Sequence, residues 1–192
     1  MLTFRPAQTH ADLEGILSLQ QANLASALDA ESLQQEGFVT VKHDLDLLRK
    51  MNQPHGHMLA LETGQVRGYC LVMLTHLADE IPVLRPMFEK IQGLDFRRRP
   101  LAELPYFVMG QVCIAKAWRG KGVFAAMYQA LAKQMGPHFE LCITEVSARN
   151  PRSLRAHTKL GFETLLIYDA PDGETWHLMA WPLSRTNLSN SH

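Results

Sequence analysis

The feature that most constrains this chain is a long apolar segment that leads directly into a glycine turn and then into an amphipathic helix. Residues 106–115 are apolar at nearly every position, which is typical of a buried strand. The turn 119–122 contains two glycines, and residues 123–135 repeat apolar side chains at helical spacing before Gly136 ends the pattern. Backbone N–H groups at a helix start are unpaired, and glycine lets an anion approach them. The segment therefore predicts a phosphate-binding turn, and a plain glycine turn fits it as well.

Two well-known phosphate loops do not fit this turn. A nucleotide-binding P-loop reads G-x-x-x-x-G-K-[ST], whereas here Gly122 follows Lys121. The dinucleotide fingerprint G-x-G-x-x-G requires glycine at the position of Ala125. Nucleotide-dependent phosphotransfer is disfavoured for a second reason, because the sequence offers no paired acidic metal ligands.

The remaining pattern predicts one α/β domain over residues 1–183, followed by a polar tail, 184–192. Strands are expected at 2–5, 37–41, 58–62, 66–73, 139–147, 164–168 and 175–182, and helices at 11–27, 43–51 and 150–160. These elements alternate without a uniform βαβ repeat, which favours a mixed sheet covered by helices on both faces. Segment 75–105 contains four prolines and a helical apolar pattern, and a connection of this length is typical of a lid over a binding site.

Composition argues against several other classes of protein. Lys plus Arg and Asp plus Glu each number 19, so no basic excess indicates a nucleic-acid partner. No run approaches the ~18 apolar residues of a membrane span. The three cysteines lie far apart in apolar segments, which indicates reduced, buried side chains and a cytoplasmic protein. His55 and His57 have no acidic or cysteine ligand at metal spacing, so we expect an exposed turn there and no metal.

A second motif follows the predicted strand 139–147. Residues 150–162, NPRSLRAHTKLGF, together with the glycine turn resemble the GNAT superfamily of N-acetyltransferases. The first motif of that family, R/Q-x-x-G-x-G/A between a strand and a helix, is matched by Arg119 and Gly122. Its second, N-x-x-A-x-x-x-Y-x-x-x-G-F, is matched by Asn150, Gly161 and Phe162. The resemblance implies the GNAT fold: a mixed, largely antiparallel sheet of about seven strands that splays between its fourth and fifth strands, with helices on both faces.

Three positions depart from the family pattern. Ser153 replaces the alanine of the second motif. Phe124 stands where the family has glycine or alanine, so the turn or the helix packing must accommodate a large side chain. His157 stands where many members carry the tyrosine that protonates the CoA thiolate.

The resemblance also implies acetyl-CoA as a co-substrate, without a metal. Backbone groups at the end of strand 106–115 would hydrogen-bond the pantetheine arm, and amides of the turn would hold the pyrophosphate. The implied set is Val112, Cys113, Ile114, Arg119, Gly120, Lys121, Gly122, Val123, Phe124 and Asn150. Asn150 also fits a helix N-cap with Pro151 at the first helical position, and the two roles are compatible.

The catalytic candidates are Glu145 and His157, twelve residues apart. In the ribosomal-protein N-terminal acetyltransferases of this superfamily, a glutamate and a tyrosine at the same spacing serve as base and acid. An attacking amine must lose a proton and a departing thiolate benefits from a donor, so the two residue types suit the reaction. The alternatives are an ordinary strand carboxylate and a packed helix-face histidine.

We therefore expect an N-acetyltransferase that moves an acetyl group from acetyl-CoA to a primary amine by direct attack in a ternary complex. The alternative is a catalytically silent acyl-CoA-binding sensor or interaction module with the same fold. The acceptor is expected to be a small-molecule or peptide amine, with neither nucleic acid nor a membrane as partner. The sequence is compatible with a homodimer and does not decide between monomer and dimer.

Overall fold

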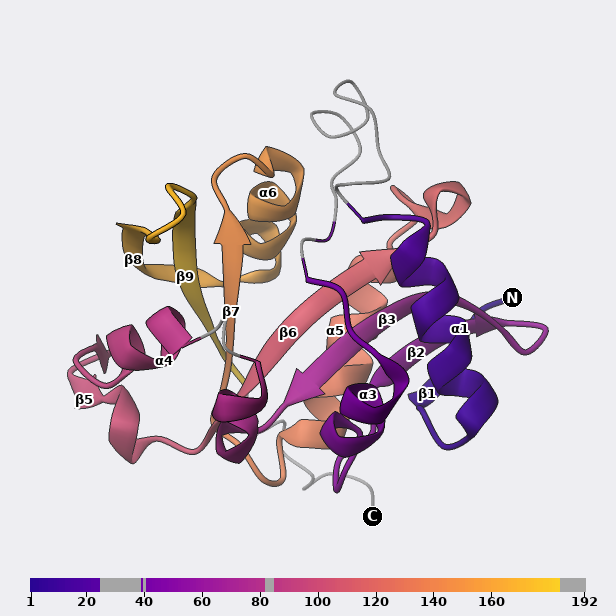
Figure 1. Ribbon diagram of the computed structural model, residues 1–192, viewed down its shortest axis with the longest axis horizontal. Coiled ribbons are helices and arrows are strands. Elements are labelled where there is room, and N and C mark those ends of the chain that lie inside the picture. The colour runs from indigo at the N-terminus through magenta and orange to yellow at the C-terminus, as the bar shows by residue number, and fades with distance from the viewer. Residues whose placement is uncertain (25–38, 40, 82–84, 184–192) are drawn as a thin grey trace, which may run out of the picture.

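The computed structural model describes residues 1–24, 39, 41–81 and 85–183 (Figure 1). Within them, seven strands form one sheet in the order β1-β2-β3-β6-β7-β9-β8. The sheet strands are β1 (Thr3–Pro6), β2 (Met58–Glu62), β3 (Gln65–Met73), β6 (Tyr106–Ile114), β7 (Leu141–Ser147), β8 (Glu163–Asp169) and β9 (Thr175–Pro182). The helices are α1 (His10–Gln21), α3 (Leu45–Met51), α4 (Arg85–Ile91), α5 (Val123–Met135) and α6 (Pro151–Leu160). All neighbouring sheet strands are antiparallel except β6 and β7.

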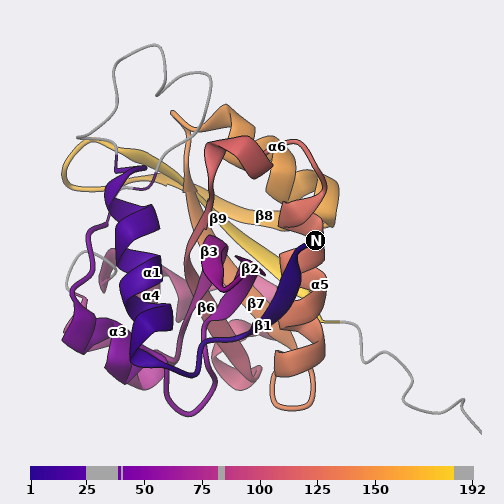
Figure 2. The ribbon, with the colours of Figure 1, turned by 90° about the vertical axis from the view of Figure 1, so that its right-hand side faces the viewer.

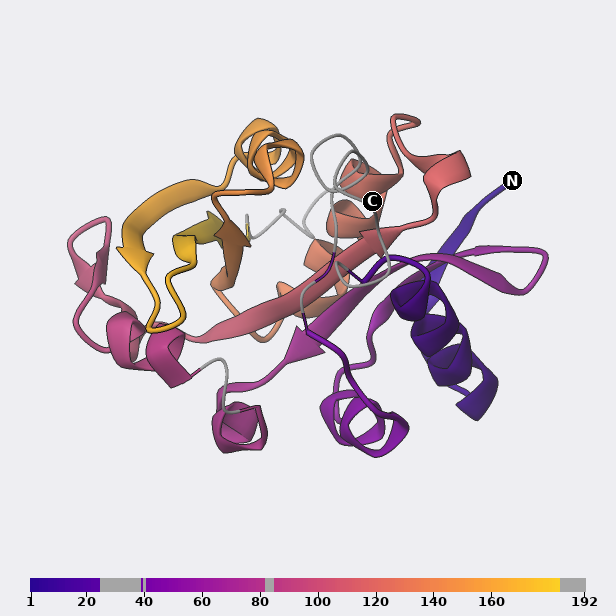
Figure 3. The same cartoon turned by 45° about the horizontal axis from the view of Figure 1, so that its top comes forward.

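The predicted mixed sheet with helices on both faces is confirmed. Helices α1, α3 and α4 cover one face, whereas α5 and α6 cover the other (Figures 2 and 3). Each face has its own apolar cluster, the first centred on Leu71, Ile143 and Leu178 and the second on Met127 and Phe107. The predicted elements 11–27 and 37–41 extend in part beyond the described residues, and the predicted tail 184–192 lies wholly outside them.

The sheet opens between its two parallel strands, as the family resemblance predicts. β6 and β7 pair only at Tyr106 with Leu141, Phe107 with Cys142 and Val108 with Ile143. Beyond these pairs the two strands diverge (Figure 1). A bulge in β6 lies near the point of divergence, because Val72 pairs with Met109 and Leu71 with Gln111. Among the described residues, the far half of β6 therefore has one backbone edge without a neighbouring strand. Unpaired N–H and C=O groups on such an edge can pair with an extended ligand.

Segment 75–105 forms structure of its own and packs into the main core. It contains a 3-10 helix, η2 (Thr75–Glu80), then α4 and a hairpin of β4 (Asp95–Phe96) and β5 (Arg99–Pro100). Its buried apolar side chains join the cluster under α1 and α3; they are Leu77, Ile81, Met87, Ile91, Phe96, Leu101 and Leu104. Arg97 pairs with Glu163 of β8 at 2.5 Å, so the segment is docked beside the sheet edge. Its role as a lid stays a prediction.

The expectation of an exposed turn at the two closely spaced histidines was wrong for His57. This side chain is fully buried: its Nδ1 accepts the Val72 N–H at 3.1 Å and its Nε2 lies 3.2 Å from the Leu48 oxygen. Burial lowers the pKa of His57 to about 4, so the ring is neutral and serves as a core hydrogen-bonding group. Among the residues that the structure describes, no cluster of three potential metal ligands occurs and no helix has the length and apolarity to cross a membrane.

Candidate active site

The glycine turn has the predicted strand–turn–helix form. After β6, a 3-10 helix, η5 (Lys116–Trp118), leads to Gly120 and Gly122, whose φ angles are +75° and +77°, and α5 begins at the next residue. These left-handed values strain any residue with a Cβ. A Cβ at either glycine would meet no atom within 4 Å in the described part of the chain. The turn is thus open on the side of the helix start, where backbone N–H groups lack intrahelical partners.

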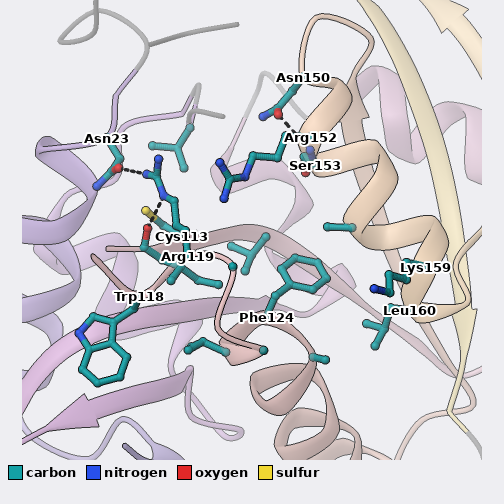
Figure 4. Close-up of a pocket in the computed structure, with 18 residues that line it drawn as sticks. Asn23, Cys113, Trp118, Arg119, Phe124, Asn150, Arg152, Ser153, Lys159 and Leu160 are labelled. Carbon is teal, nitrogen blue, oxygen red and sulfur yellow. Dashed lines mark hydrogen bonds between the residues drawn. The ribbon is translucent and has the colours of Figure 1, made fainter. Parts of the chain in front are cut away.

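A cavity of about 480 Å³ lies against this turn, between β6, the start of α5 and α6 (Figure 4). Nine of the ten residues predicted to bind CoA line it: Val112, Cys113, Ile114, Arg119, Gly120, Gly122, Val123, Phe124 and Asn150. The tenth, Lys121, does not line it, and its ammonium lies 5.3 Å from the centroid of the Trp118 ring. Whether these residues bind CoA stays a prediction.

Three of the described residues that line the cavity are cationic, and they come from the turn and from α6. Arg119 lies at the turn, and Arg152 and Lys159 belong to α6. Among the described lining residues there is no Asp or Glu. A cavity with cations, a helix start and no acid fits a ligand that carries several phosphates. Sequence reasoning missed Arg152 and Lys159, because their relevance depends on where α6 lies relative to the turn.

Arg119 also fixes the turn in place. Its Nε donates to the Ile114 oxygen at 2.8 Å, and its terminal nitrogen donates to the Asn23 amide oxygen, just beyond the end of α1 (Figure 4). The side chain therefore connects the end of β6 with the residues just beyond α1. Asn23 lines the cavity as well, a contribution that no motif in the sequence indicated.

His157 lies beside this cavity but is almost completely buried, at 1% exposure. Its Nδ1 lies 2.8 Å from the backbone oxygen of Ser153, and its Nε2 lies 2.8 Å from the Tyr128 hydroxyl. Burial lowers the pKa of His157 to about 4, so the ring is neutral near pH 7. Because a carbonyl oxygen only accepts, Nδ1 carries the hydrogen, and Nε2 then accepts from Tyr128.

Two of the departures from the family pattern contact each other. The ring of Phe124 packs against His157, with ring centroids 5.0 Å apart, and against Tyr128, with centroids 4.8 Å apart. The large side chain is therefore accommodated between α5 and α6 rather than over the glycines. This packing also helps to bury the His157 ring.

Glu145 lies in β7 on the opposite face of the sheet from His157. Side chains alternate along β7: Ile143 joins the cluster under α1, and Val146 joins the cluster under α5. By this alternation Glu145 faces the α1 side, whereas His157 packs with Tyr128 of α5. The Tyr168 hydroxyl of β8 donates to Glu145 Oε1. Burial raises the pKa of Glu145 to about 7, and the hydrogen bond from Tyr168 opposes part of that rise.

A smaller cavity of about 70 Å³ lies at the gap between β6 and β7, and residues from both faces of the sheet line it. Its lining includes Glu145 and Trp176 from the α1 side and Ser153 and His157 from the α6 side. Both predicted catalytic residues thus border one space, although they project from opposite faces of the sheet.

A buried polar network holds β6 at the edge of this smaller cavity. The Gln20 amide donates to His43 Nδ1 at 2.9 Å and to Gln111 Oε1 at 2.8 Å. The Tyr69 hydroxyl donates to the same Gln111 oxygen at 2.7 Å. Sequence reasoning missed this network, although Gln111 was visible as a polar residue inside an apolar strand and buried polar groups need partners.

The fold and the site together define an acyltransferase architecture: a sheet splayed at its parallel strands, with a cation-lined cavity at a glycine turn. Residues 24–162 match the sequence model of the acetyltransferase (GNAT) family. The chain therefore belongs to the GNAT acetyltransferase family. No significant match was found among curated proteins.

Solved structures agree with this assignment at the level of the fold. The ribosomal-protein-S18-alanine N-acetyltransferase from Escherichia coli matches with a TM-score of 0.61 and 15% identity over 100% of both chains. The structure of yncA from Salmonella typhimurium with its cofactor acetyl-CoA matches with a TM-score of 0.62 and 15% sequence identity, over 100% of this chain and 99% of that one. Ard1 from Thermoplasma volcanium matches with a TM-score of 0.64 and 14% sequence identity, over 94% of this chain and 97% of that one.

Proposed function

We propose that this protein transfers an acetyl group from acetyl-CoA to a primary amine by direct attack in a ternary complex. The observation that carries the proposal is that two neighbouring cavities beside the gap between β6 and β7 share lining residues. One is the cation-lined cavity at the glycine turn, and the other contains Glu145. Such a junction lets an amine approach a thioester from the face opposite to the bound cofactor.

The larger cavity supports acetyl-CoA as the acyl donor. Its size and its cationic lining suit a ligand with an extended arm and several phosphates. The open backbone edge of β6 suits the amide groups of a pantetheine arm, which can pair with a strand as another strand would. The ten residues named from the family resemblance remain the proposed binding set, with Arg152 and Lys159 as further phosphate-facing candidates.

Glu145 supports amine acetylation through its position and its ionisation. An alkyl amine with a pKa near ~10 is mostly ammonium at neutral pH, so a proton must leave before nitrogen attacks. A carboxylate with a pKa of about 7 is poised to take that proton. Nitrogen then attacks the thioester carbon, and the tetrahedral intermediate loses a second proton from nitrogen. The C–S bond breaks with its electron pair on sulfur, and the thiolate departs on the other side of the sheet. His157, the proposed acid-side residue, lies on that side and acts through a neighbour described below.

The acceptor is proposed to be a small-molecule or peptide amine. The rim of the smaller cavity offers one carboxylate, Glu145, and one large aromatic side chain, Trp176, and both attract an ammonium group. Three free, buried cysteines, Cys70, Cys113 and Cys142, support a reducing compartment and hence the cytoplasm.

A catalytically silent acyl-CoA-binding module is the second candidate. The observation in its favour is the burial of His157, which takes the position of the family tyrosine without presenting a donor directly to the cavity. A module of this kind would bind CoA and leave the thioester intact.

One experiment separates the two candidates. The purified protein is incubated with acetyl-CoA and a panel of amines that includes peptide N-termini, polyamines and amino acids. Free thiol release is followed, and the acetylated product is identified by mass spectrometry. We expect amine-dependent thiol release that falls by two or more orders of magnitude in Glu145→Gln, which keeps an acceptor for Tyr168. Calorimetric CoA binding without thiol release for any amine would establish the silent module instead.

A further inference from the structure

The two cavities share only a few lining residues, and these mark where the thioester must lie. The described residues that line both are Val39, Val112, Asn150 and Ser153. A bound thioester has to reach this junction, because the donor occupies one cavity and the amine arrives through the other. Two of the four side chains are polar, Asn150 and Ser153. The amide oxygen of Asn150 is engaged as the N-cap of α6, where it accepts the Ser153 N–H at 3.1 Å (Figure 4).

The hydroxyl of Ser153 is oriented by the buried histidine behind it. Ser153 Oγ lies 3.3 Å from His157 Nδ1. That nitrogen carries the ring hydrogen, because it also faces the Ser153 carbonyl oxygen at 2.8 Å. The hydroxyl oxygen can therefore only accept from the ring, and its own hydrogen is left to donate elsewhere. Within residues 1–24, 39, 41–81 and 85–183, no other acceptor is hydrogen-bonded by this hydroxyl.

The sequence gives this arrangement a second, independent support. Against the family pattern, the hydroxyl of the tyrosine is missing at His157, and a hydroxyl absent from the pattern appears at Ser153. The two positions lie four residues apart on α6, so they project from the same face of the helix one turn apart. Helix α6 thus still places one hydroxyl beside both cavities, and Ser153 in its first turn provides it.

We propose that the Ser153 hydroxyl hydrogen-bonds the CoA sulfur as the thiolate leaves, and that His157 is a positioning residue which orients this hydroxyl. This proposal rests on the acetyl-transfer function proposed above. It identifies Ser153 as the residue that touches the leaving group, a contribution made possible by the replacement of the family alanine.

No proton passes through the buried pair of His157 and Tyr128 in this step. As the C–S bond breaks, its electron pair stays on sulfur, and the Ser153 O–H···S⁻ bond stabilises the charge. The ammonium nitrogen loses two protons, one before attack and one as the tetrahedral intermediate collapses to the amide; Glu145 takes each in turn and passes it to water. The thiolate takes a proton from water after it leaves the site. Ser153 keeps its own hydrogen, His157 keeps the one on Nδ1, and Tyr128 keeps the one donated to Nε2.

The test uses CoA alone, with no amine. The thiol pKa of bound CoA is measured by ultraviolet absorbance of the thiolate, with the free protein as reference. Burial raises the pKa of Cys113 to about 11 and the pKa values of Cys70 and Cys142 further, so the protein's own thiols stay protonated across the titration. A hydrogen bond to an anion favours that anion by about 10- to 100-fold, so Ser153→Ala should raise the bound thiol pKa by about one to two units. Ser153→Thr keeps a hydroxyl and should restore most of the difference.

Two further measurements complete the test. His157→Phe removes the orienting donor, so the bound thiol pKa should rise by less than in Ser153→Ala. In turnover, Ser153→Ala should lower kcat by about 10- to 100-fold and leave the KM for acetyl-CoA nearly unchanged. An unchanged thiol pKa in a folded Ser153→Ala protein that still binds CoA would overturn the proposal. If the thiol pKa shifts as expected but no amine is acetylated, the sulfur contact stands and the proposed transfer function falls.

Discussion

The raised pKa of Glu145, which follows from the burial of its carboxyl group, can be tested by two independent measurements. Its pKa rises from an ordinary value of 4.5 to about 7 because the carboxylate is buried beside Tyr168. Between these pH values the native protein binds more protons than the unfolded chain. The contribution of Glu145 to the free energy of unfolding therefore falls as pH rises from about 4.5 to about 7, and it levels off above that. The shift corresponds to about 3 kcal/mol of lost stability at pH 8 relative to pH 4.

The matched variant for this effect is Glu145→Gln, which cannot ionise. The free energies of unfolding of Glu145→Gln and of the wild type are measured by urea unfolding from pH 4 to pH 8. We expect the variant to gain about 3 kcal/mol of stability relative to the wild type over this range. In Tyr168→Phe the hydrogen bond that lowers the Glu145 pKa is lost, so the midpoint of the transition should move to higher pH. A difference between wild type and Glu145→Gln that stays constant from pH 4 to pH 8 would refute the assigned burial of this carboxylate.

The same ionisation should appear in turnover. With both substrates saturating, kcat should rise about tenfold per pH unit below about 7 and then reach a plateau, because the base must be ionised to accept the proton. His157, with a pKa of about 4, is already neutral in this range and should add no descending limb between pH 6 and pH 9. The measure is kcat, because the ionisation of the free amine also enters kcat/KM. A flat kcat profile in this range would remove Glu145 from the role of base.

Three further predictions concern the turn, the cavity and the inserted segment. Gly122→Glu should abolish acetyl-CoA binding in calorimetry. The control is Gly64→Glu, at a hairpin glycine with a similar positive φ and equally open space, which should lose a comparable stability of about 1 to 2 kcal/mol and still bind acetyl-CoA normally. Equal binding by both variants would contradict the phosphate site. Lys159→Ala should raise the KM for acetyl-CoA several-fold with kcat nearly unchanged, an effect that grows at low ionic strength. Leu101→Ala should destabilise the whole domain by about 2 to 5 kcal/mol, because this residue of segment 75–105 is fully buried in the main core; a much smaller loss would indicate an independently packed lid.

Local patterns in the sequence predicted much of the fold and the glycine turn that borders the larger cavity. The strand, the glycine turn and α5 were predictable because apolar periodicity and the left-handed preference of glycine act over a few neighbouring residues. The start of α6 was predictable for the same reason: Asn150 caps it, and Pro151 occupies its first position. The motifs at these two points were also enough to indicate the family before any contact between them was known.

The surroundings of Glu145 were decided by tertiary structure alone. Glu145 and Tyr168 are 23 residues apart and meet only because β7, β9 and β8 are adjacent in the sheet in a fixed register. A slip of one residue in that register would turn Glu145 to the other face, since side chains alternate along a strand. Burial then shifted the two pKa values in opposite directions: it raises that of the Glu145 carboxyl group to about 7 and lowers that of the His157 imidazole to about 4. Residue identity determined which groups could titrate. Only the packing of distant strands and helices determined their pKa values, because desolvation depends on neighbours that the local sequence does not contain.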